Sequence, residues 1–242
     1  MIQIFKKEIN SFLNSIIAYI VISVFLTAIG LFMWVFPDTS VLNYGFADMD
    51  TLFSFGPYVL MFLVPAITMR MLAEERKSGT MELLLTKPLT DYQIILGKFL
   101  AGFALVFLSI APTIIYYFSI SSLGNPPGNI DTAGITGSYV GLLLLGMIFT
   151  SIGLFASSLN DNQVVSFITA IFLCFIFFSG FEYLSALTNL GTLASPLEKA
   201  GILYHYHFMS KGLIDVGNVI YFLSVTAFMI LLTKFVLSSR KW

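Results

Sequence analysis

The sequence predicts an all-α integral membrane protein with six transmembrane helices. Hydrophobic residues make up 57% of the chain and charged residues only 10%, and the mean hydropathy is +0.91. These values lie far outside the range of a soluble globular domain. Six stretches are apolar over the length of about 20 residues that a helix needs to cross a bilayer. Because apolar residues run continuously through each stretch instead of alternating, transmembrane β-strands are excluded.

The predicted spans are separated by short connections. They cover about residues 15–36, 55–72, 99–121, 138–158, 164–181 and 218–237. The first span follows Lys6 and Lys7 as a secretion signal would, but it has no clear small-x-small cleavage site and further spans follow it, so we interpret it as retained. Residues 1–242 are therefore expected to form one transmembrane domain, without a soluble enzyme domain of ordinary size. The single cysteine, Cys174, excludes an intrachain disulfide.

The distribution of lysine and arginine predicts that both termini are cytoplasmic. With the N-terminus inside, ten of the twelve basic residues fall on the cytoplasmic side: Lys6, Lys7, Arg70, Arg76, Lys77, Lys87, Lys98, Lys234, Arg240 and Lys241. The outer connections then hold the acids Asp38, Asp48, Asp50 and Asp131, with Lys199 and Lys211 in the last and longest of them. This asymmetry follows the positive-inside rule.

The connections differ in character. Residues 37–54 are acidic and rich in turn-forming residues, and residues 122–137 contain GNPPGN, which cannot continue a helix. The LNDNQ segment at residues 159–163 is short enough to make the fourth and fifth spans antiparallel neighbours. Residues 182–217 are only half polar, and we expect them to hold short helices that re-enter the outer leaflet.

Small residues line one face of the fourth span. They are Gly146, Thr150, Gly153 and Ser157, at offsets of four, three and four residues. Such a face lets another helix approach closely. The ordinary interpretation is packing within the chain, and the alternative is an interface between subunits.

A charged segment, LAEERKSGTMELLLTKPLTDYQIILGK, connects the second and third spans at residues 72–98. Gly79 is expected to end the first helix of this segment, Thr80 to cap a short helix MELLLT, and Pro88 to stop it. Thr90 and Gln93 match a capping box that starts the next helix, with Asp91 in its first turn. The short apolar helix needs a cover, which is either the lipid headgroup layer or a groove of a soluble partner.

The run EERKSGTMELLLTKPLT resembles the cytoplasmic signature of ABC transporter permeases of the type-2 exporter class. The layout of six spans with inner termini and a long last outer loop is also similar to that family. Residues 207–225, HFMSKGLIDVGNVIYFLSV, resemble the segment before the last span in the subgroup that includes gliding-motility and multicopper-maturation permeases. The resemblance covers essentially the whole chain.

The resemblance implies that the charged segment is the elbow that touches a separate ATPase, with residues 80–86 as a coupling helix. The implied coupling residues are Glu74, Glu75, Arg76, Gly79, Thr80, Glu82, Leu83, Leu84, Thr86 and Pro88. It further implies an exporter in a bacterial inner membrane, a second permease copy or related membrane subunit, and ATP and Mg²⁺ held by the ATPase. No nucleic-acid partner is expected.

The chain itself is not expected to be an enzyme or to hold a cofactor or metal. A phosphate-binding loop needs Ser or Thr after Gly-Lys, whereas Phe99 follows Gly97 and Lys98. A metal-linked enzyme is the alternative that uses His205 and His207, but two residues of separation put them on opposite sides of a helix, and they would need help from Glu182 or Asp215.

Glu182 is an outer-face candidate together with His205 and His207, because it is an ionisable residue at the edge of the hydrocarbon region. Its ordinary interpretation is a residue that reaches the headgroup layer. A third alternative is a membrane scaffold that does not transport. No charged residue lies near the centre of a predicted span, which argues against a path for small ions and suits an amphipathic cargo or the transmission of motion.

Overall fold

The computed structural model describes residues 1–43, 45–81, 90–187 and 194–239. Within these ranges all regular structure is helical. The elements in chain order are α1 (Ile2–Leu13), α2 (Ile16–Trp34), η1 (Val41–Asn43), α3 (Asp50–Thr68), α4 (Arg70–Lys77), α6 (Asp91–Ile110), η2 (Ala111–Thr113), α7 (Ile114–Leu123), α8 (Thr132–Leu159), α9 (Gln163–Phe175), η3 (Ile176–Gly180), α10 (Phe181–Leu187), α11 (Ala194–Ala200), α12 (Ile202–Met209) and α13 (Val216–Ser238).

The prediction of six membrane-length helices is confirmed for the described residues. They are Ile16–Trp34, Asp50–Lys77, Asp91–Leu123, Thr132–Leu159, Gln163–Ala186 and Val216–Ser238. The second and third are longer than the predicted spans, because helices α4 and α6 continue through charged and polar residues that a search for apolar stretches leaves out. These two helices therefore include residues 72–77 and 91–98 of the charged segment.

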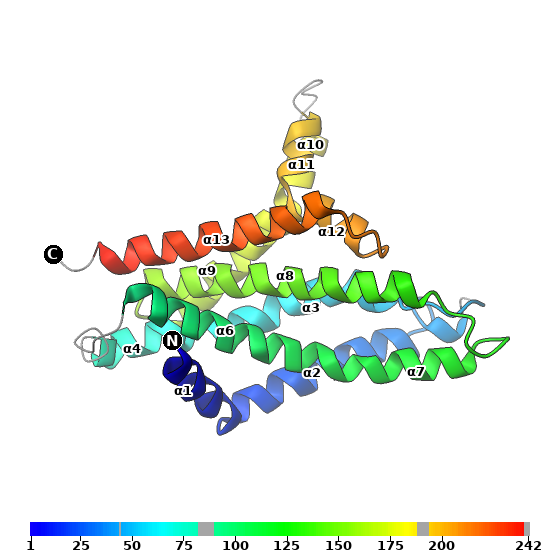
Figure 1. Cartoon of the computed structure of the whole chain (residues 1–242), viewed down its shortest axis with the longest axis horizontal. Helices are drawn as coiled ribbons and strands as arrows, with labels where there is room; N and C mark the ends of the chain where they lie inside the picture. The colour runs from blue at the N-terminus through cyan, green and yellow to red at the C-terminus, as the bar shows by residue number, and fades with distance from the viewer. Residues whose placement is uncertain (44, 82–89, 188–193, 240–242) are drawn as a thin grey trace.

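Helix α8 forms the centre of the bundle. In its most apolar stretch 78% of the residues are buried, against 28% for α2, for the helix formed by α9 to α10, and for α13. Helices α3, α6, α9 and α13 pack against it, and Figure 1 shows it running through the middle of the molecule. Small residues permit this close packing, because a Cβ at Gly146 would lie only 2.6 Å from Val106 Cγ1.

Most of the described charged residues lie at the two ends of the bundle. Helix α1, helix α4, the first turns of α6 and the last turns of α13 lie together at one end (Figure 1). We call it the basic end, and its described basic residues are Lys6, Lys7, Arg70, Arg76, Lys77, Lys98 and Lys234. Residues Asp38, Asp48, Asp50 and Asp131 belong to connections and helix starts at the opposite end.

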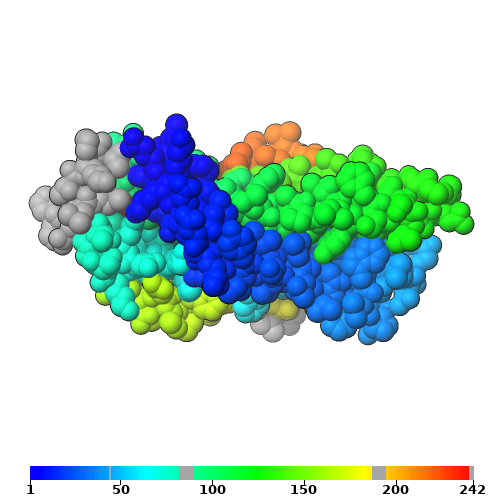
Figure 2. Space-filling model, turned by 90° about the horizontal axis from the view of Figure 1, so that it is seen from below, coloured from blue at the N-terminus to red at the C-terminus, as the bar shows by residue number. Residues whose placement is uncertain are grey.

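Helix α1 is an amphipathic helix that precedes the first span and that the sequence analysis did not predict. Ile4, Glu8 and Phe12 recur every four residues and are buried, whereas Lys6 and Lys7 are exposed. Figure 2 shows α1, in dark blue, lying across the surface of the bundle. The Ser15 hydroxyl accepts a hydrogen bond from the Ile17 amide at 3.2 Å and caps the following span.

Three short helices lie between the fifth and sixth spans. Helices α10 and α11 pack on one another and project from the side of the bundle, while α12 packs against α8 and α13 (Figure 1). The expected short helices are therefore present, and their entry into the outer leaflet stays a prediction. A π-helical segment, η3, joins α9 to α10, and Cys174 just before it is buried.

Candidate functional site

The second span passes into the charged segment without a loop. Helix α3 ends at Thr68 and α4 begins at Arg70, with only Met69 between them. Helix α4 carries the sequence RMLAEERK and ends at Lys77. Gly79 then has a φ of +70°, a left-handed conformation that glycine adopts without strain. The predicted helix end at this glycine is confirmed.

Helix α4 has one face in the protein and one in solvent. Met71, Leu72 and Ala73 are buried, whereas Glu74 and Lys77 are exposed. Its buried face contacts α8 and α9. The helix is therefore held against the bundle while its charged face stays accessible at the basic end.

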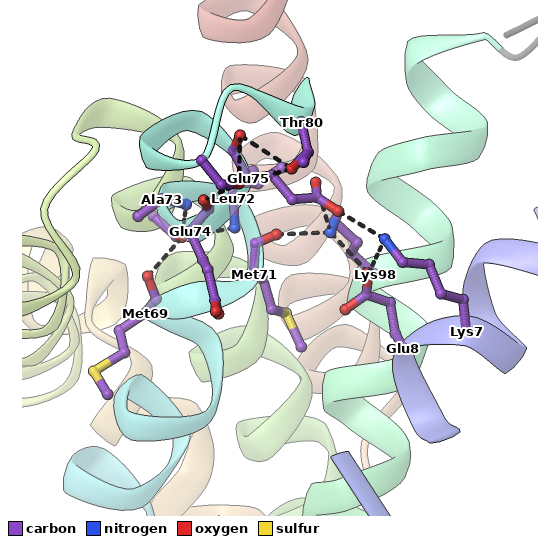
Figure 3. A network of polar contacts seen from close by, with 12 residues as sticks. Lys7, Glu8, Met69, Met71, Leu72, Ala73, Glu74, Glu75, Thr80 and Lys98 are labelled. Atoms are coloured by element: carbon purple, nitrogen blue, oxygen red, sulfur yellow. Dashed lines mark hydrogen bonds and ion pairs between the residues drawn. The ribbon is translucent and has the colours of Figure 1, made fainter. Parts of the chain in front are cut away.

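A buried ammonium group joins α4 to two other helices. Lys98 of α6 is only 1% exposed, and its Nζ lies 2.9 Å from Glu8 Oε1, 2.9 Å from Glu75 Oε2 and 2.7 Å from the carbonyl oxygen of Met71 (Figure 3). Lys7 Nζ adds an ion pair to Glu75 Oε1 at 3.1 Å. We call Lys7, Glu8, Glu75 and Lys98 the Lys98 cluster.

The Lys98 cluster has equal numbers of positive and negative groups. A buried ammonium ion is costly unless opposite charges and hydrogen bonds replace its water shell. Glu8 and Glu75 supply the opposite charges, and the Met71 carbonyl supplies a further acceptor. The cluster therefore fixes α1, α4 and α6 to one another at the basic end.

The sequence analysis assigned Lys98 to the cytoplasmic side of the membrane but did not predict that the residue is buried. Helix α6 begins at Asp91, so Lys98 lies two turns inside it, and α1 covers its ammonium group. An available signal was overlooked, because Glu8 interrupts the apolar stripe of Ile4 and Phe12 on an otherwise amphipathic helix. An acid at such a position requires a buried partner.

The start of α6 is tied to the end of α13. The Thr90 hydroxyl accepts from the Gln93 amide at 3.4 Å, and the Gln93 side chain accepts from the Thr90 amide at 3.3 Å, which confirms the predicted capping box. Ser238 Oγ donates to Asp91 Oδ2 at 3.3 Å, and Lys234 Nζ lies 4.1 Å from the centre of the Tyr92 ring. The first and last described helices thus meet the third span at the same end.

The predicted coupling residues have different surroundings. Glu74, Gly79 and Thr80 are exposed, and the Thr80 hydroxyl donates to the Glu75 carbonyl at 3.3 Å. The Glu75 carboxylate instead points into the Lys98 cluster, and Arg76 is half-buried. The remaining predicted residues, Glu82, Leu83, Leu84, Thr86 and Pro88, lie outside the described residues.

The small-residue face of α8 contacts other helices of the same chain. Gly146 faces Val106 of α6, and Thr150 lies against Gly102 of the same helix. A Cβ at Gly153 would overlap the Thr68 hydroxyl at the end of α3.

Ser157 reaches the joint between α3 and α4, where its hydroxyl bonds the backbone of Met69, Leu72 and Ala73. The small-residue face therefore runs along the second and third spans to the basic end.

The outer-face candidates fall into two groups. Glu182 and His207 line a cavity of about 320 Å³ together with Phe178, Tyr204 and Phe208. His205 does not line it.

The His205 ring stacks on Tyr221 at 3.8 Å between ring centres, and its nitrogens lie 2.7 Å from Asn218 Oδ1 and 2.9 Å from the Lys199 carbonyl oxygen. In the part of the chain that the structure describes, no three His, Cys, Asp or Glu side chains are grouped to hold a metal ion.

Residues 37–233 match a family profile described as ABC-2 family transporter protein. The matched range contains α3 to α12 and most of α13, and thus α4, Lys98 and the small-residue face of α8. Helices α1 and α2 precede it. No curated protein matches the sequence.

Proposed function

Because the chain belongs to the ABC-2 transporter family, we propose that it is the permease subunit of an ATP-driven exporter, coupled through residues 74–98 to a separate ATPase. The expected site is a bacterial inner membrane. Gly97 and Lys98 form the only Gly-Lys pair in the sequence, and Phe99 follows them where a phosphate-binding loop has Ser or Thr. The Lys98 ammonium is moreover engaged by Glu8, Glu75 and Met71, so a partner has to supply the nucleotide site.

The observation that carries this proposal is the continuity of the second span with α4. A force that a partner applies at the exposed Gly79 turn acts first on α4. Helix α4 continues into α3 with one intervening residue. The Lys98 cluster links the same helix to α1 and α6. Movement of α4 is therefore transmitted to several spans without an intervening flexible linker. An ATPase-driven change between helix arrangements requires such a connection.

The exposed surface at the end of α4 has the chemistry of a polar protein contact. Glu74, Lys77, Ser78 and Thr80 present both signs of charge and two hydroxyl groups. The family signature that follows supports residues 80–86 as the coupling helix. Of its two possible covers, we propose the ATPase groove, since a headgroup layer alone would not explain a charged helix that ends at a defined turn beside it.

The transport pathway is proposed to need a second copy of the chain or a related membrane subunit. Six spans form half of the pathway in the family that the sequence resembles. Helices α2 and α13 leave most of their apolar stretch unburied within one chain, so apolar surface remains for lipid and for another subunit. The resemblance of residues 207–225 supports the gliding-motility-associated permeases as the nearest subgroup.

A metal-linked enzyme is less well supported. Both ring nitrogens of His205 lie within hydrogen-bonding distance of protein oxygens, so neither is directed at an open coordination position. His207 lines a different surface, beside Glu182. A non-transporting scaffold would bind an ATPase without changing its rate of hydrolysis, and the second experiment below separates it from a permease.

Photo-crosslinking tests the docking surface. A benzophenone amino acid at Lys77, on the exposed face of α4, is expected to form a covalent adduct with an ATPase whose sequence contains a phosphate-binding loop. The same probe at Asn129, in the connection at the opposite end, is the control and should not. Adducts of Lys77 that contain only lipid or further copies of this chain would overturn the proposal.

Deletion of residues 80–86 tests coupling itself. The deletion, or the single change Glu82→Lys, should abolish stimulation of the ATPase by the permease in nanodiscs while the bundle stays folded by circular dichroism. Stimulated hydrolysis that survives the deletion would assign coupling to another surface. A partner that binds but is never stimulated by the native chain would favour the scaffold.

A further inference from the structure

Ser157 of α8 uses the full hydrogen-bonding capacity of its hydroxyl on the backbone of another helix. Its Oγ accepts from the Leu72 amide at 3.0 Å and from the Ala73 amide at 3.1 Å, and it donates to the Met69 carbonyl oxygen at 2.9 Å. The residue is 0% exposed. A hydroxyl offers one donor and two acceptor positions, so all three are occupied.

The hydroxyl stands inside the hydrogen-bond ladder of the second span. In an uninterrupted α-helix the Ala73 amide would donate directly to the Met69 carbonyl, four residues earlier. The Ser157 hydroxyl accepts from the Ala73 amide and donates to the Met69 carbonyl, so it bridges these two groups. Insertion of a side chain into the ladder is an established cause of a helix bend. The insertion coincides with the boundary between α3 and α4.

Two further contacts hold the joint between α3 and α4 in place. The Met71 carbonyl accepts from Lys98 Nζ at 2.7 Å, so side chains from α6 and α8 bond the backbone of the joint from separate helices. Gly153, one turn before Ser157, has no room for a Cβ beside Thr68. The close approach at Gly153 brings α8 near enough for a side chain as short as serine to reach the ladder. Figure 3 shows the contacts at Met69, Leu72 and Ala73.

We propose that Ser157 is a positioning residue for transport, the pivot on which α4 changes its angle to α3. The proposal rests on the proposed function, in which an ATPase moves α4. A bridging hydroxyl keeps the Met69 carbonyl and the Ala73 amide bonded while the distance between them changes. A direct bond would break, and an unbonded backbone group inside a membrane protein is costly. The pivot also connects α4 to α8, the central helix.

Ser158 and Ser151 supply matched controls. Both are buried serines of α8, but their hydroxyls donate to carbonyls of the same helix, at Phe155 and Ile148, each at 2.7 Å. Ser158→Ala and Ser151→Ala each remove one hydroxyl oxygen from α8, as Ser157→Ala does. Neither removal touches the ladder of the second span.

The test measures the angle of α4 by double electron–electron resonance. Spin labels are attached through Lys77→Cys on α4 and Asp161→Cys in the turn after α8, in a Cys174→Ala background. In nanodiscs without nucleotide, Ser157→Ala is expected to shift the mean distance by about 2 Å or more, the scale of helix shifts in switching proteins, while Ser158→Ala leaves it unchanged.

The same labelled permease is then measured with its ATPase and a non-hydrolysable ATP analogue. The shift that the analogue produces in the native sequence should be lost in Ser157→Ala and retained in Ser158→Ala and in the conservative variant Ser157→Thr. Identical distances for Ser157→Ala and Ser158→Ala overturn the inference. So does a Ser157→Ala chain that has a changed resting distance but keeps the full nucleotide response, because the hydroxyl would then be only structural.

A label-free comparison covers the case in which Ser157→Ala does not fold. Hydrogen exchange at the Leu72 and Ala73 amides should be about tenfold faster in Ser157→Cys than in Ser158→Cys, because a thiol is a weaker acceptor than a hydroxyl. Equal exchange rates overturn the pivot. The resting distance and the exchange rates need no ATPase, so a failure of the docking proposal leaves a distinct pattern: no nucleotide response in the native sequence and an intact effect of Ser157.

Discussion

The Lys98 ammonium and the Glu8 carboxylate lie 2.9 Å apart, although 90 positions separate the two residues in the chain. The contact joins the amphipathic helix α1 to the third span beneath the surface of the protein. Since Lys98 also bonds the Met71 carbonyl and pairs with Glu75, the same ammonium group orients α4. The N-terminal helix is thus part of the basic end.

Removal of the Lys98 charge should destabilise the permease strongly. Among the described residues, Lys98→Met leaves the exposed Lys7 as the remaining ion-pair partner of Glu8 and Glu75, and breaking a buried ion pair from one side costs about 3 kcal/mol or more. The free energy of unfolding in detergent, followed by circular dichroism, measures the loss. Lys6→Met, an exposed change on α1, is the control and should alter it by less than about 0.5 kcal/mol.

A triple variant separates charge imbalance from lost packing. Lys98→Met combined with Glu8→Gln and Glu75→Gln removes all the buried charges, and most of the lost stability should return, because replacing a whole buried ion-pair set is often close to neutral. If Lys98→Met is no more harmful than Lys6→Met, the Lys98 cluster does not stabilise the basic end.

The contact between Gly153 and Thr68 predicts a second sensitive position. Gly153→Ala places a methyl group where the Thr68 hydroxyl lies, and overpacking of a well-filled core costs about 1–3 kcal/mol. Gly180→Ala is the matched control, since its new methyl would meet no atom nearer than 3.5 Å. Thermal unfolding should show a clear loss for the first variant only. Adding Thr68→Ala should recover part of it, and no recovery would locate the damage elsewhere.

Local signals in the sequence predicted those parts of the fold that depend on neighbouring residues. Apolar length predicted the six spans, Gly79 predicted the end of α4, and Thr90 with Gln93 predicted the start of α6. Each of these is determined within about one helical turn or by the bilayer itself.

The main features of the site could not be predicted in this way, because they depend on partners far away in the chain. The burial of Lys98 needs Glu8 from a helix that was not predicted, and the interruption at Met69 needs a hydroxyl from α8. Ser157 was identified for its small size on a helix face, and its hydrogen bonds gave no sequence signal. Spacing along one helix indicates which residues share a face, but not what the neighbouring helix presents to them.

Asp48, at the end of the bundle opposite the basic end, predicts a dependence of stability on pH. Burial raises the pKa of this carboxyl above its ordinary value of 3.8, the hydrogen bond from the Asp50 amide lowers it, and the Asp50 charge raises it. A raised pKa in the folded state means that the contribution of Asp48 to stability is present below pH 3.8 and is lost as the pH rises through the folded-state pKa. The ionised carboxylate therefore opposes folding at neutral pH.

The variant Asp48→Asn should accordingly be more stable than the native sequence at pH 7, and this advantage should vanish in acid below the ordinary pKa. Asparagine keeps an oxygen for the Asp50 amide, which donates to Asp48 Oδ1 at 3.2 Å. Asp48→Ala removes that acceptor as well, so the increase in its stability at pH 7 should be smaller than that of Asp48→Asn. Melting curves of the three proteins from pH 3 to pH 7 check the order. A less stable Asp48→Asn at pH 7 would contradict the assigned direction.

Glu74 and Glu75 are adjacent, but their substitutions should have different effects on stability and on ATPase crosslinking. Glu75 pairs with Lys7 and Lys98, so Glu75→Gln is expected to lower the free energy of unfolding by about 2 kcal/mol or more. Glu74 is exposed on the solvent face of α4, so Glu74→Lys should leave stability within about 0.5 kcal/mol while it reduces the yield of the ATPase adduct formed from Lys77.

The milder Glu74→Gln removes the charge without reversing it and should give an intermediate crosslinking yield. Unfolding and crosslinking measured on the same preparations separate the two effects, because a loss of adduct that follows only from unfolding would track stability across all three variants. If Glu74→Lys leaves the adduct yield unchanged, the solvent face of α4 is not part of the docking surface. If Glu75→Gln is neutral for unfolding, the link between α4 and the third span depends on the Met71 carbonyl instead of the paired charges.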